Sequence, residues 1–533
     1  MKKLLIFFAL FLSLLIQELQ AKTYDLNIAR QKTNIAGKVA KKITINGTIP
    51  GPILYFTDGE DVIINVTNHM KEETSLHWHG LLVPPAMDGV PGLNGFAGIK
   101  LDETFSYNFK IRQTGTYWYH SHSRGQEQDG EYGAIVIKPK GVEPVKSDRD
   151  YVVLLSDYHD EDAKTIMDNL KMSSEYYQYA RRTIGDFFQS VKKDGWNQAW
   201  ENSKMWNKMR MLPTDLADVA DYTFLTNGKT SQENWTAIFK KNEKVRLRFI
   251  NGSSMSFFDV RIPDLKMFVV ASDGQNLEPV PVDEFRFAPA EIYDVIVTPK
   301  VDKAYTIIAE PLDRSGFALS SLAPKEGMRG EIPTQRKRVL LTMKDMGMNM
   351  GKVSHNMAEM SEMDMSSGWA KTGAPEGSKI LNYSDLRYFG VQKDLRQPIS
   401  EIIVRLGGNM DRYIWTINGK TDGEAKPINL KYGQRAKLTF INETMMAHPM
   451  HLHGMFFQLE NGQPISKLPN KNVVIVPPGD SYSVLLSANE IGEWSFHCHL
   501  LYHMMSGMMT KIVVAKLDEK DVPKSTSKPN HAH

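Results

Sequence analysis

The chain has 533 residues, of which 41% are hydrophobic, and its formal net charge is +2. This length is too great for one compact core and indicates three or four domains, while the hydrophobic content excludes a disordered chain. The small net charge, without a basic stripe that carries interleaved aromatic residues, argues against nucleic-acid binding.

The N-terminus has the features of a secretory signal peptide. Lys2 and Lys3 precede the apolar run LLIFFALFLSLLI of residues 4–16, and a polar stretch ends at Ala21. The run is shorter than the roughly 20 residues of a membrane-spanning helix, so we expect a cleaved signal peptide rather than an anchor, and no membrane association afterwards. No twin-arginine pair precedes the run, which indicates general export and loading of any metal after export.

Three copies of a short pattern divide the rest of the chain. In each copy a strand ending in Asn-Gly is followed by an alternating strand that ends in another Asn. The Asn-Gly pairs begin at Asn46, Asn227 and Asn418. The alternating strands, at residues 61–68, 244–251 and 436–442, predict half-buried antiparallel strands bounded by turns. We therefore expect an all-β protein of three β-sandwich or barrel domains.

The steps between the copies are longer than a simple sandwich, which requires insertions. Residues from about 160 to 216 have helical composition and predict two or three helices within the second domain. Residues 343–377 are rich in Met, Gly and Ser and predict a linker or mobile flap. The expected boundaries are 1–21 for the signal peptide, 22–141 for domain 1, 148–342 for domain 2, 343–377 for the linker or flap, 378–517 for domain 3 and 518–533 for a C-terminal tail.

Ten of the fifteen histidines lie in four short motifs. These are HWHG at 77–80, HSH at 120–122, HPMHLHG at 448–454 and HCHLLYH at 497–503. One H-x-H pair is more often a surface accident or a pair of core histidines than a site. Four such clusters, all in the first and third units, predict a metal centre. Imidazole, thiolate and thioether ligands favour a soft or borderline transition metal, copper in particular.

The only cysteine, Cys498, stands between His497 and His499. A single cysteine cannot form a disulfide within the chain. On a strand, residues two apart project from one face about 6.5–7 Å apart, and the residue between them projects from the opposite face. The two histidines can therefore hold adjacent metals on one side while Cys498 holds another metal on the other side, so that one backbone segment connects two sites.

The ligand count separates into two sets. Four H-x-H pairs supply eight imidazoles, enough for three metals with two or three ligands each. His448, Cys498, His503 and a distal methionine remain. Two histidines, one cysteine and a weak axial thioether are typical of a blue electron-transfer copper.

At this point the sequence resembles a known family. HWHG, YWYHSH, HPMHLHG and HCHLLYHMMSGM are similar to the four signature motifs of the multicopper oxidases, in the same order and with matching spacing. The resemblance covers nearly the whole mature chain as three cupredoxin domains with Greek-key topology. MDGVPGLNGFAGI, TYWYHSHSRGQEQDGEYG and the methionine-rich insertion are most similar to the copper-resistance oxidases of bacterial periplasms. It implies a periplasmic oxidase with four copper ions that passes electrons from a reductant to dioxygen, which is reduced to two waters.

The resemblance also implies a role for each ligand. The blue type 1 copper would take His448, Cys498 and His503, with Met508 as axial ligand. The type 2 copper would take His77 and His451. One type 3 copper would take His79, His120 and His499. The other type 3 copper would take His122, His453 and His497. Met504, Met505 and Met509 lie close to Met508, and a methionine at the axial position would suit core packing as well.

Two further residues have implied catalytic roles. Cys498 would pass electrons from the type 1 copper to the cluster. Asp88 in AMDGVPG matches an acid that the family uses near the cluster, and it would help to deliver protons. The alternative is an ordinary Asp-Gly turn. Some relatives have a second acid directly after the last type 1 histidine, but Met504 occupies that position here, so a second proton relay is not indicated.

The methionines are the best indication of the reductant. Thioethers prefer Cu(I) to harder ions, so we interpret the methionine-rich segment as one that collects Cu(I) for the type 1 site. Its methionines are Met343, Met346, Met348, Met350, Met357, Met360, Met363 and Met365. The alternative is a stripe that packs one face of a short helix. Met446 matches a substrate-binding methionine of cuprous oxidases, but the acid that these proteins place two residues earlier is Thr444 here.

Three functions remain open. The leading hypothesis is an oxidase that converts Cu(I) to Cu(II) with dioxygen as acceptor and serves copper tolerance, with periplasmic copper-handling proteins as candidate partners. The first alternative is a laccase-like oxidase of phenols or other small organic reductants, whose methionine segment is only a lid. The second alternative is a periplasmic copper-sequestering protein, although storage does not need a complete trinuclear ligand set.

Overall fold

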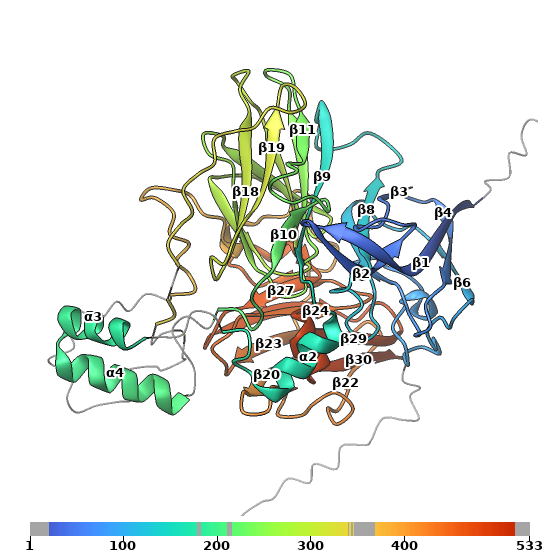
Figure 1. Ribbon diagram of the computed structural model, residues 1–533. Coiled ribbons are helices and arrows are strands. Elements are labelled where there is room, and N and C mark those ends of the chain that lie inside the picture. The colour runs from blue at the N-terminus through green and yellow to red at the C-terminus, as the bar shows by residue number, and fades with distance from the viewer. Residues whose placement is uncertain are drawn as a thin grey trace, which may run out of the picture.

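The computed structural model describes residues 21–178, 183–209, 216–338, 340–342, 345 and 368–516. Residues 1–20 of the predicted signal peptide, most of the methionine-rich segment and residues 517–533 therefore lie outside the described part of the chain. Within that part, no helix is both long enough and apolar enough to cross a membrane. Six β-sheets follow one another along the chain as three pairs, which we call the first, second and third units (Figure 1).

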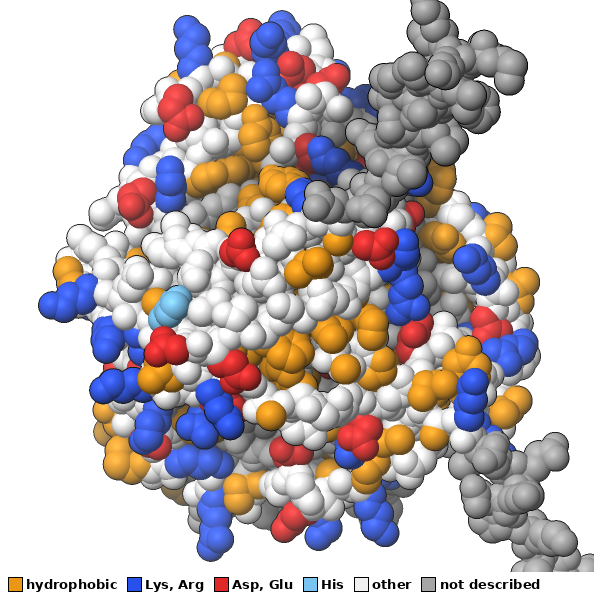
Figure 2. Space-filling model, turned by 90° about the vertical axis from the view of Figure 1, so that its right-hand side faces the viewer, with side chains coloured by type: hydrophobic (Ala, Val, Ile, Leu, Met, Phe, Trp, Pro, Cys, Tyr) orange, Lys and Arg blue, Asp and Glu red, His pale blue; other side chains and the backbone are white. Residues whose placement is uncertain are grey.

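The first unit consists of two four-stranded sheets. One sheet has the order β2-β1-β4-β6 and contains β1 (Lys22–Ile35), β2 (Lys38–Ile45), β4 (Asp61–Asn68) and β6 (Thr104–Lys110). The other has the order β3-β8-β7-β5 and contains β3 (Leu54–Thr57), β5 (His77–His79), β7 (Gly115–His120) and β8 (Tyr132–Lys138). Figure 2 shows the face of this unit, where Lys and Arg are interspersed with Asp and Glu.

The second unit pairs a six-stranded sheet with a five-stranded sheet. The first has the order β10-β9-β12-β17-β14-β15 and contains β9 (Arg149–Tyr158), β10 (Thr223–Thr226), β12 (Val245–Asn251), β14 (Met267–Ser272), β15 (Gln275–Val282) and β17 (Ile292–Val297). The other has the order β11-β19-β18-β13-β16 and contains β11 (Thr236–Ile238), β13 (Phe258–Arg261), β16 (Glu284–Phe287), β18 (Tyr305–Pro311) and β19 (Ala318–Ala323).

The third unit repeats this arrangement of six and five strands. The larger sheet has the order β21-β20-β23-β28-β25-β26 and contains β20 (Ser400–Asn409), β21 (Ile414–Ile417), β23 (Arg435–Asn442), β25 (Phe457–Leu459), β26 (Asn470–Lys471) and β28 (Ser481–Ser487). The smaller sheet has the order β22-β30-β29-β24-β27 and contains β22 (Ile428–Lys431), β24 (His448–Leu452), β27 (Val473–Val476), β29 (Gly492–Cys498) and β30 (Met509–Ala515). The predicted all-β class of sandwiches is confirmed.

The repeated Asn-Gly pairs have the same local structure in all three units. The asparagines have φ angles of 52°, 50° and 52°, a left-handed conformation that Asn tolerates better than most residues. Each side-chain oxygen also accepts a hydrogen bond from a backbone N–H of the neighbouring strand, at 2.7–2.8 Å. The donors are Asn27, Leu154 and Arg405. The repeat in the sequence therefore marks one turn that is tied to its sheet in the same way three times.

The strand prediction was wrong in one respect, because the alternating strands are not purely antiparallel. β4, β12 and β23 each pair in parallel with the first strand of their unit, β1, β9 and β20. In the first unit, for example, β3 lies in the other sheet, so the chain leaves β1 and β2 and returns as β4 beside β1. The remaining neighbours of these strands, β6, β17 and β28, are antiparallel.

β12 also departs from the predicted half-buried pattern, since all its residues are buried. Its polar positions are Arg246 and Arg248, each only 2% exposed. Both arginines form ion pairs with Asp294 of β17, and Arg248 donates a hydrogen bond to Thr116 of β7 in the first unit at 2.8 Å. The polar face of β12 is buried because the first unit packs against it, and charge pairing makes this burial tolerable.

Three helices lie within the segment predicted to be helical. They are α2 (Ala163–Met172), α3 (Ile184–Asp194) and α4 (Trp196–Met209). α2 begins after the capping residue Asp162 and contacts the third unit, where Lys171 Nζ donates to the carbonyl of Tyr413 at 2.6 Å. α3 and α4 pack on each other and project away from the sheets, to the left in Figure 1.

Candidate metal centre

Three buried side chains of the third unit converge on one point. His448 begins β24, Cys498 ends β29, and His503 lies on the short helix α5 (Leu501–Met505). Cys498 Sγ lies 3.5 Å from His448 Nδ1 and 3.8 Å from His503 Nδ1, and the two Nδ1 atoms are 3.2 Å apart. Burial raises the pKa of the Cys498 thiol, so that a thiolate here needs a bound cation. The sequence-predicted type 1 residues His448, Cys498 and His503 are therefore brought together.

The opposite edges of these two imidazoles are held by hydrogen bonds. His448 Nε2 lies 2.7 Å from the Thr444 hydroxyl. His503 Nε2 lies 2.7 Å from Asp218 Oδ2, which also accepts a hydrogen bond from the Tyr413 hydroxyl at 2.7 Å. Both Nδ1 atoms are thereby left facing Cys498. Asp218 was missed by the sequence analysis, because it belongs to the second unit and to no motif.

Met508 is also buried beside this triad. Its carbonyl accepts a hydrogen bond from the Cys498 N–H at 3.1 Å, and its own N–H donates to the His503 carbonyl at 3.0 Å. The Met508 backbone therefore ties together the two segments that carry these ligands. Its axial role stays a prediction.

Eight histidines from the first and third units form a second cluster. His77 and His79 lie on β5, and His120 and His122 lie at and after the end of β7. The third unit supplies His451, His453, His497 and His499. β24 and β29 pair with His451 opposite His497 and Met450 opposite Cys498, so the thiol and its neighbouring imidazoles lie on opposite faces of β29. This is the arrangement that strand geometry predicts.

The members of each predicted ligand set lie close together, although the division into sets stays a prediction. The predicted type 2 pair His77 and His451 offers ring nitrogens within 4.8 Å of each other. His497 Nε2 lies 3.4 Å from His122 Nε2 and 3.2 Å from His453 Nε2, which brings one predicted type 3 set together. In the other set, the ring centroid of His79 lies 5.7 Å from that of His120 and 5.1 Å from that of His499.

Several imidazoles of the cluster are held at one ring nitrogen and leave the other without a partner. Backbone carbonyls accept hydrogen bonds from Nδ1 of His77, His451 and His497 at 2.8–2.9 Å. The buried Nε2 atoms of His77, His79, His120, His451 and His499 have no hydrogen-bond partner. An unpaired buried nitrogen is costly, whereas a metal ion would satisfy it. Burial also lowers the pKa of most cluster histidines, that of His497 to about 4, so they are neutral and able to bind metal.

Asp88 is in contact with the histidine cluster. Its Oδ2 accepts a hydrogen bond from His453 Nδ1 at 2.8 Å, its Oδ1 lies 3.4 Å from His77 Nδ1, and its carbonyl is the acceptor for His77. The carboxylate thereby connects histidines of the first and third units. The Asp-Gly turn is also present, because Gly89 has a φ of 81° and a Cβ there would lie 1.8 Å from the Leu76 carbonyl oxygen. The turn and the contact with the cluster thus coexist, and the role of Asp88 in proton delivery stays a prediction.

Comparison with known proteins places this centre in a family. Models of the multicopper oxidase family match residues 27–141, 149–323 and 396–518. Copper resistance protein A of Escherichia coli is 42% identical over 93% of both chains, and the Copper resistance protein A homolog of Pseudomonas syringae pv. tomato is 43% identical over 93% of both. The chain belongs to the multicopper oxidase family. The crystal structure of Fet3p, a multicopper oxidase that functions in iron import, covers 93% of this chain and 90% of its own, with a TM-score of 0.69 and 20% identity.

As a multicopper oxidase, the chain is a copper-dependent oxidoreductase, and its three units are cupredoxin-like domains. The donor atoms fit copper, since one thiolate and neutral imidazoles are ligands that copper prefers. The geometry supplies one group of a thiol and two imidazoles, and a cluster of eight neighbouring imidazoles.

Glu127 is a second acid beside the cluster of this multicopper oxidase, and the sequence analysis missed it. Its Oε2 lies 2.7 Å from His120 Nδ1, and the residue is only 2% exposed. Burial raises the pKa of Glu127. It follows His120 by seven residues, but the residues between them form turns rather than a helix or strand, so no periodicity of an element connects the two side chains.

The role of the predicted substrate-binding methionines stays a prediction. Met446 is 5% exposed, and its carbonyl accepts a hydrogen bond from Asn442 Nδ2 at 2.7 Å in the loop that leads to His448. The eight methionines predicted between residues 343 and 365 lie outside the described residues.

Proposed function

We propose that this multicopper oxidase converts Cu(I) to Cu(II) in the periplasm, with dioxygen as the electron acceptor, and thereby contributes to copper tolerance. The names of the two curated relatives, which refer to copper resistance, support this assignment. The predicted signal peptide supports export.

We assign four copper ions to the two sites. The type 1 ion takes His448, Cys498 and His503, with Met508 axial, and the type 2 ion takes His77 and His451. The type 3 ions take His79, His120 and His499, and His122, His453 and His497. Bound copper would supply one-electron oxidation of the substrate and the reduction of dioxygen. Cys498 would carry electrons through the backbone to His497 and His499. Asp88 Oδ1, which has no hydrogen-bond partner while Oδ2 accepts from His453, would hold a proton for delivery.

The attachment of the methionine-rich segment is the observation that carries the choice of Cu(I). Asp345 Oδ2 accepts a hydrogen bond from the Gly368 N–H at 2.7 Å, so the two sides of residues 346–367 are joined at one place. Arg286 then donates to the carbonyls of Trp369 and Lys371, and Arg314 donates to the Thr372 carbonyl at 2.9 Å.

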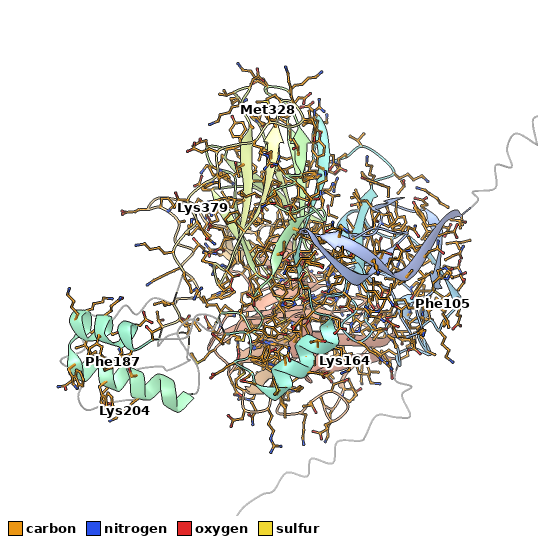
Figure 3. The ribbon with its side chains drawn as sticks, viewed as in Figure 1. Phe105, Lys164, Phe187, Lys204, Met328 and Lys379 are labelled. Carbon is orange, nitrogen blue, oxygen red and sulfur yellow. The ribbon has the colours of Figure 1, made fainter. Side chains whose placement is uncertain are left out.

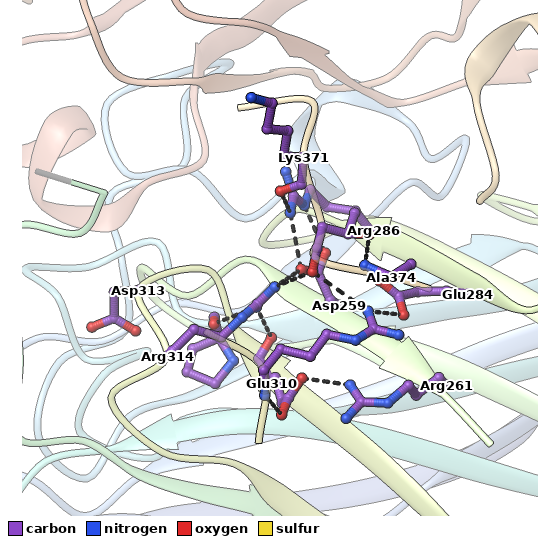
Figure 4. A network of polar contacts seen from close by, with 12 residues as sticks. Asp259, Arg261, Glu284, Arg286, Glu310, Asp313, Arg314, Lys371 and Ala374 are labelled. Atoms are coloured by element: carbon purple, nitrogen blue, oxygen red, sulfur yellow. Dashed lines mark hydrogen bonds and ion pairs between the residues drawn. The ribbon is translucent and has the colours of Figure 1, made fainter. Parts of the chain in front are cut away.

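A network of buried charges holds the two arginines that bind residues 369–372. Asp259 accepts hydrogen bonds from both Arg286 and Arg314, as Figure 4 shows, with Glu284 and Glu310 close by. Opposite charges hold the pKa of Asp259 below its ordinary value despite its burial. Residues 369–372, which we call the anchor, are thus held by paired charges within the second unit rather than by surface contacts.

The anchor lies near residues 216–218, which lead to the type 1 ligand His503. The rings of Trp369 and Phe257 pack at 5.1 Å, and Phe257 lines a small cavity together with Leu216 and Ala217. The next residue, Asp218, bonds to His503. The described residues that flank the methionine-rich segment therefore lie near the contact to His503, which supports the proposal that its thioethers concentrate Cu(I) for the type 1 site. Burial of Met445 and Met446, at 8% and 5% exposure, also favours a metal ion over a bulky phenol.

Oxygen uptake by the copper-loaded protein tests the proposal, with Cu(I) or a simple phenol as sole reductant. The Cys498→Ser variant serves as the blank for spontaneous Cu(I) oxidation. We expect uptake with Cu(I) well above the blank and little uptake with the phenol. Fast turnover of the phenol with Cu(I) no better than the blank would refute the proposal in favour of a laccase-like oxidase.

A further inference from the structure

A cleft of about 600 Å³ lies between the first and third units, on a side of the histidine cluster that the proposed function does not use. His122 and Arg124 line it from the first unit, and Met504, Met505 and Met509 line it from the third. His122 is the link between this cleft and the copper centre.

His122 is also the most accessible of the proposed ligands. It is partly exposed, whereas the other nine ligand histidines are 0–3% exposed. The predicted export route implies that copper enters the protein after it has been exported. An ion that enters the folded chain has to reach the cluster where a ligand is accessible, and the cleft provides such access at His122.

The three methionines give the cleft a chemical preference. Each is partly buried and lines the cleft, and Met505 Sδ lies so close to Gly125 that a Cβ at that glycine would be 3.0 Å from the sulfur. The charged lining residues Glu73 and Asp422 are offset by Arg124 and Lys171, so charge gives no preference for a cation. Thioethers, by contrast, select Cu(I) over harder ions.

We propose that this cleft is a copper uptake site, in which the thioethers of Met504, Met505 and Met509 bind Cu(I) and transfer it to His122 while the histidine cluster is being filled. The transfer is an exchange of ligands in which copper stays Cu(I). The proposal rests on the assigned role of His122, but it is independent of which reductant the enzyme oxidises at the type 1 site.

The test compares rates of copper loading in the full-length apo-protein. The variant Met504→Leu/Met505→Leu/Met509→Leu keeps the side-chain volume and removes the sulfur atoms. Cu(I) is added without oxygen, unbound copper is removed at timed intervals, and copper per chain is measured together with the blue absorption that develops in air. We expect the type 1 site to fill at the wild-type rate and the other three ions to load about tenfold more slowly.

The matched control is Met172→Leu/Met328→Leu/Met410→Leu, whose methionines do not line the cleft; Met328 lies at the far end of the second unit in Figure 3. The control should load like the wild type.

Loading of the cleft variant at the wild-type rate, or equal slowing of the type 1 site and the cluster, would overturn the uptake site and leave the oxidase assignment intact. A wild-type chain that never holds four ions would overturn the ligand assignment as well. If circular dichroism shows that the triple variant is unfolded, Met504→Leu and Met509→Leu alone should each slow cluster loading about threefold, and wild-type rates in both would overturn the proposal.

Discussion

Replacement of Asp218 by Asn should raise the reduction potential of the type 1 site. The Asp218 carboxylate lies 2.7 Å from His503 Nε2, on the side of the ring opposite the proposed metal-binding Nδ1. A negative charge at this position stabilises the more positive, oxidised ion and makes His503 a more basic ligand. Asn is nearly the same size and keeps an oxygen that accepts the hydrogen bond, so the geometry should survive while the charge is lost.

The size of the effect follows from Coulomb's law. With a metal–nitrogen bond of about 2 Å, the carboxylate oxygen and the metal are about 7 Å apart across the ring. One unit charge at that distance and an effective dielectric constant of about 20 contributes about 2.4 kcal/mol. For a one-electron couple this corresponds to a rise of about 100 mV.

A redox titration of the blue absorption measures this potential directly. Asp221→Asn is the matched control, because Asp221 is exposed and its φ of 62° is one that Asn also adopts. The control should stay within about 20 mV of the wild type. An unchanged or lowered potential in Asp218→Asn, with the blue absorption intact, would refute the argument that this carboxylate stabilises oxidised copper.

Three further predictions concern a proton donor, a turn and a buried acid. Asp88→Asn should keep its copper, because an amide oxygen still accepts from His453, but oxygen uptake should fall about 100-fold through loss of a proton donor; full turnover at full copper content would contradict this. Asn418→Ala should lower the free energy of unfolding by about 2 kcal/mol in urea denaturation, since it loses the hydrogen bond from Arg405 N–H and places Ala at a φ of 52°, whereas the exposed Asn429→Ala should change it little. Burial raises the pKa of Glu131 from 4.5 to about 8, so the folded state holds a proton that the unfolded state releases, and stability should fall as the pH rises from about 4.5 to 8. Glu131→Gln should flatten this part of the stability curve, and an unchanged slope would show that another group is responsible.

The candidate metal ligands could be recognised in the sequence because they lie in short motifs. The period of a strand alone places His497 and His499 on one face and Cys498 on the other, and the four motifs are too regular to arise from core packing. The Asn-Gly repeat was equally visible, since each copy needs the same left-handed residue at the same turn.

The groups that surround the ligands could not be predicted in the same way. Asp218 reaches His503 across 285 positions of the chain, and Glu127 reaches His120 through turns that belong to no helix or strand, so neither contact is set by the geometry of one element. The burial of Arg246 and Arg248 depends on the packing of two units, which the alternation of a single strand does not report. Short-range patterns thus identified the donor atoms, and tertiary contacts decided how those atoms are held.

The stoichiometry of the reaction tests the central claim most directly. The copper-loaded protein is given a known amount of Cu(I), and the oxygen consumed and any hydrogen peroxide formed are measured together. Reduction of dioxygen to water predicts four Cu(I) oxidised for each dioxygen and no peroxide above the Cys498→Ser blank. Two Cu(I) for each dioxygen, with peroxide as the product, would contradict the account.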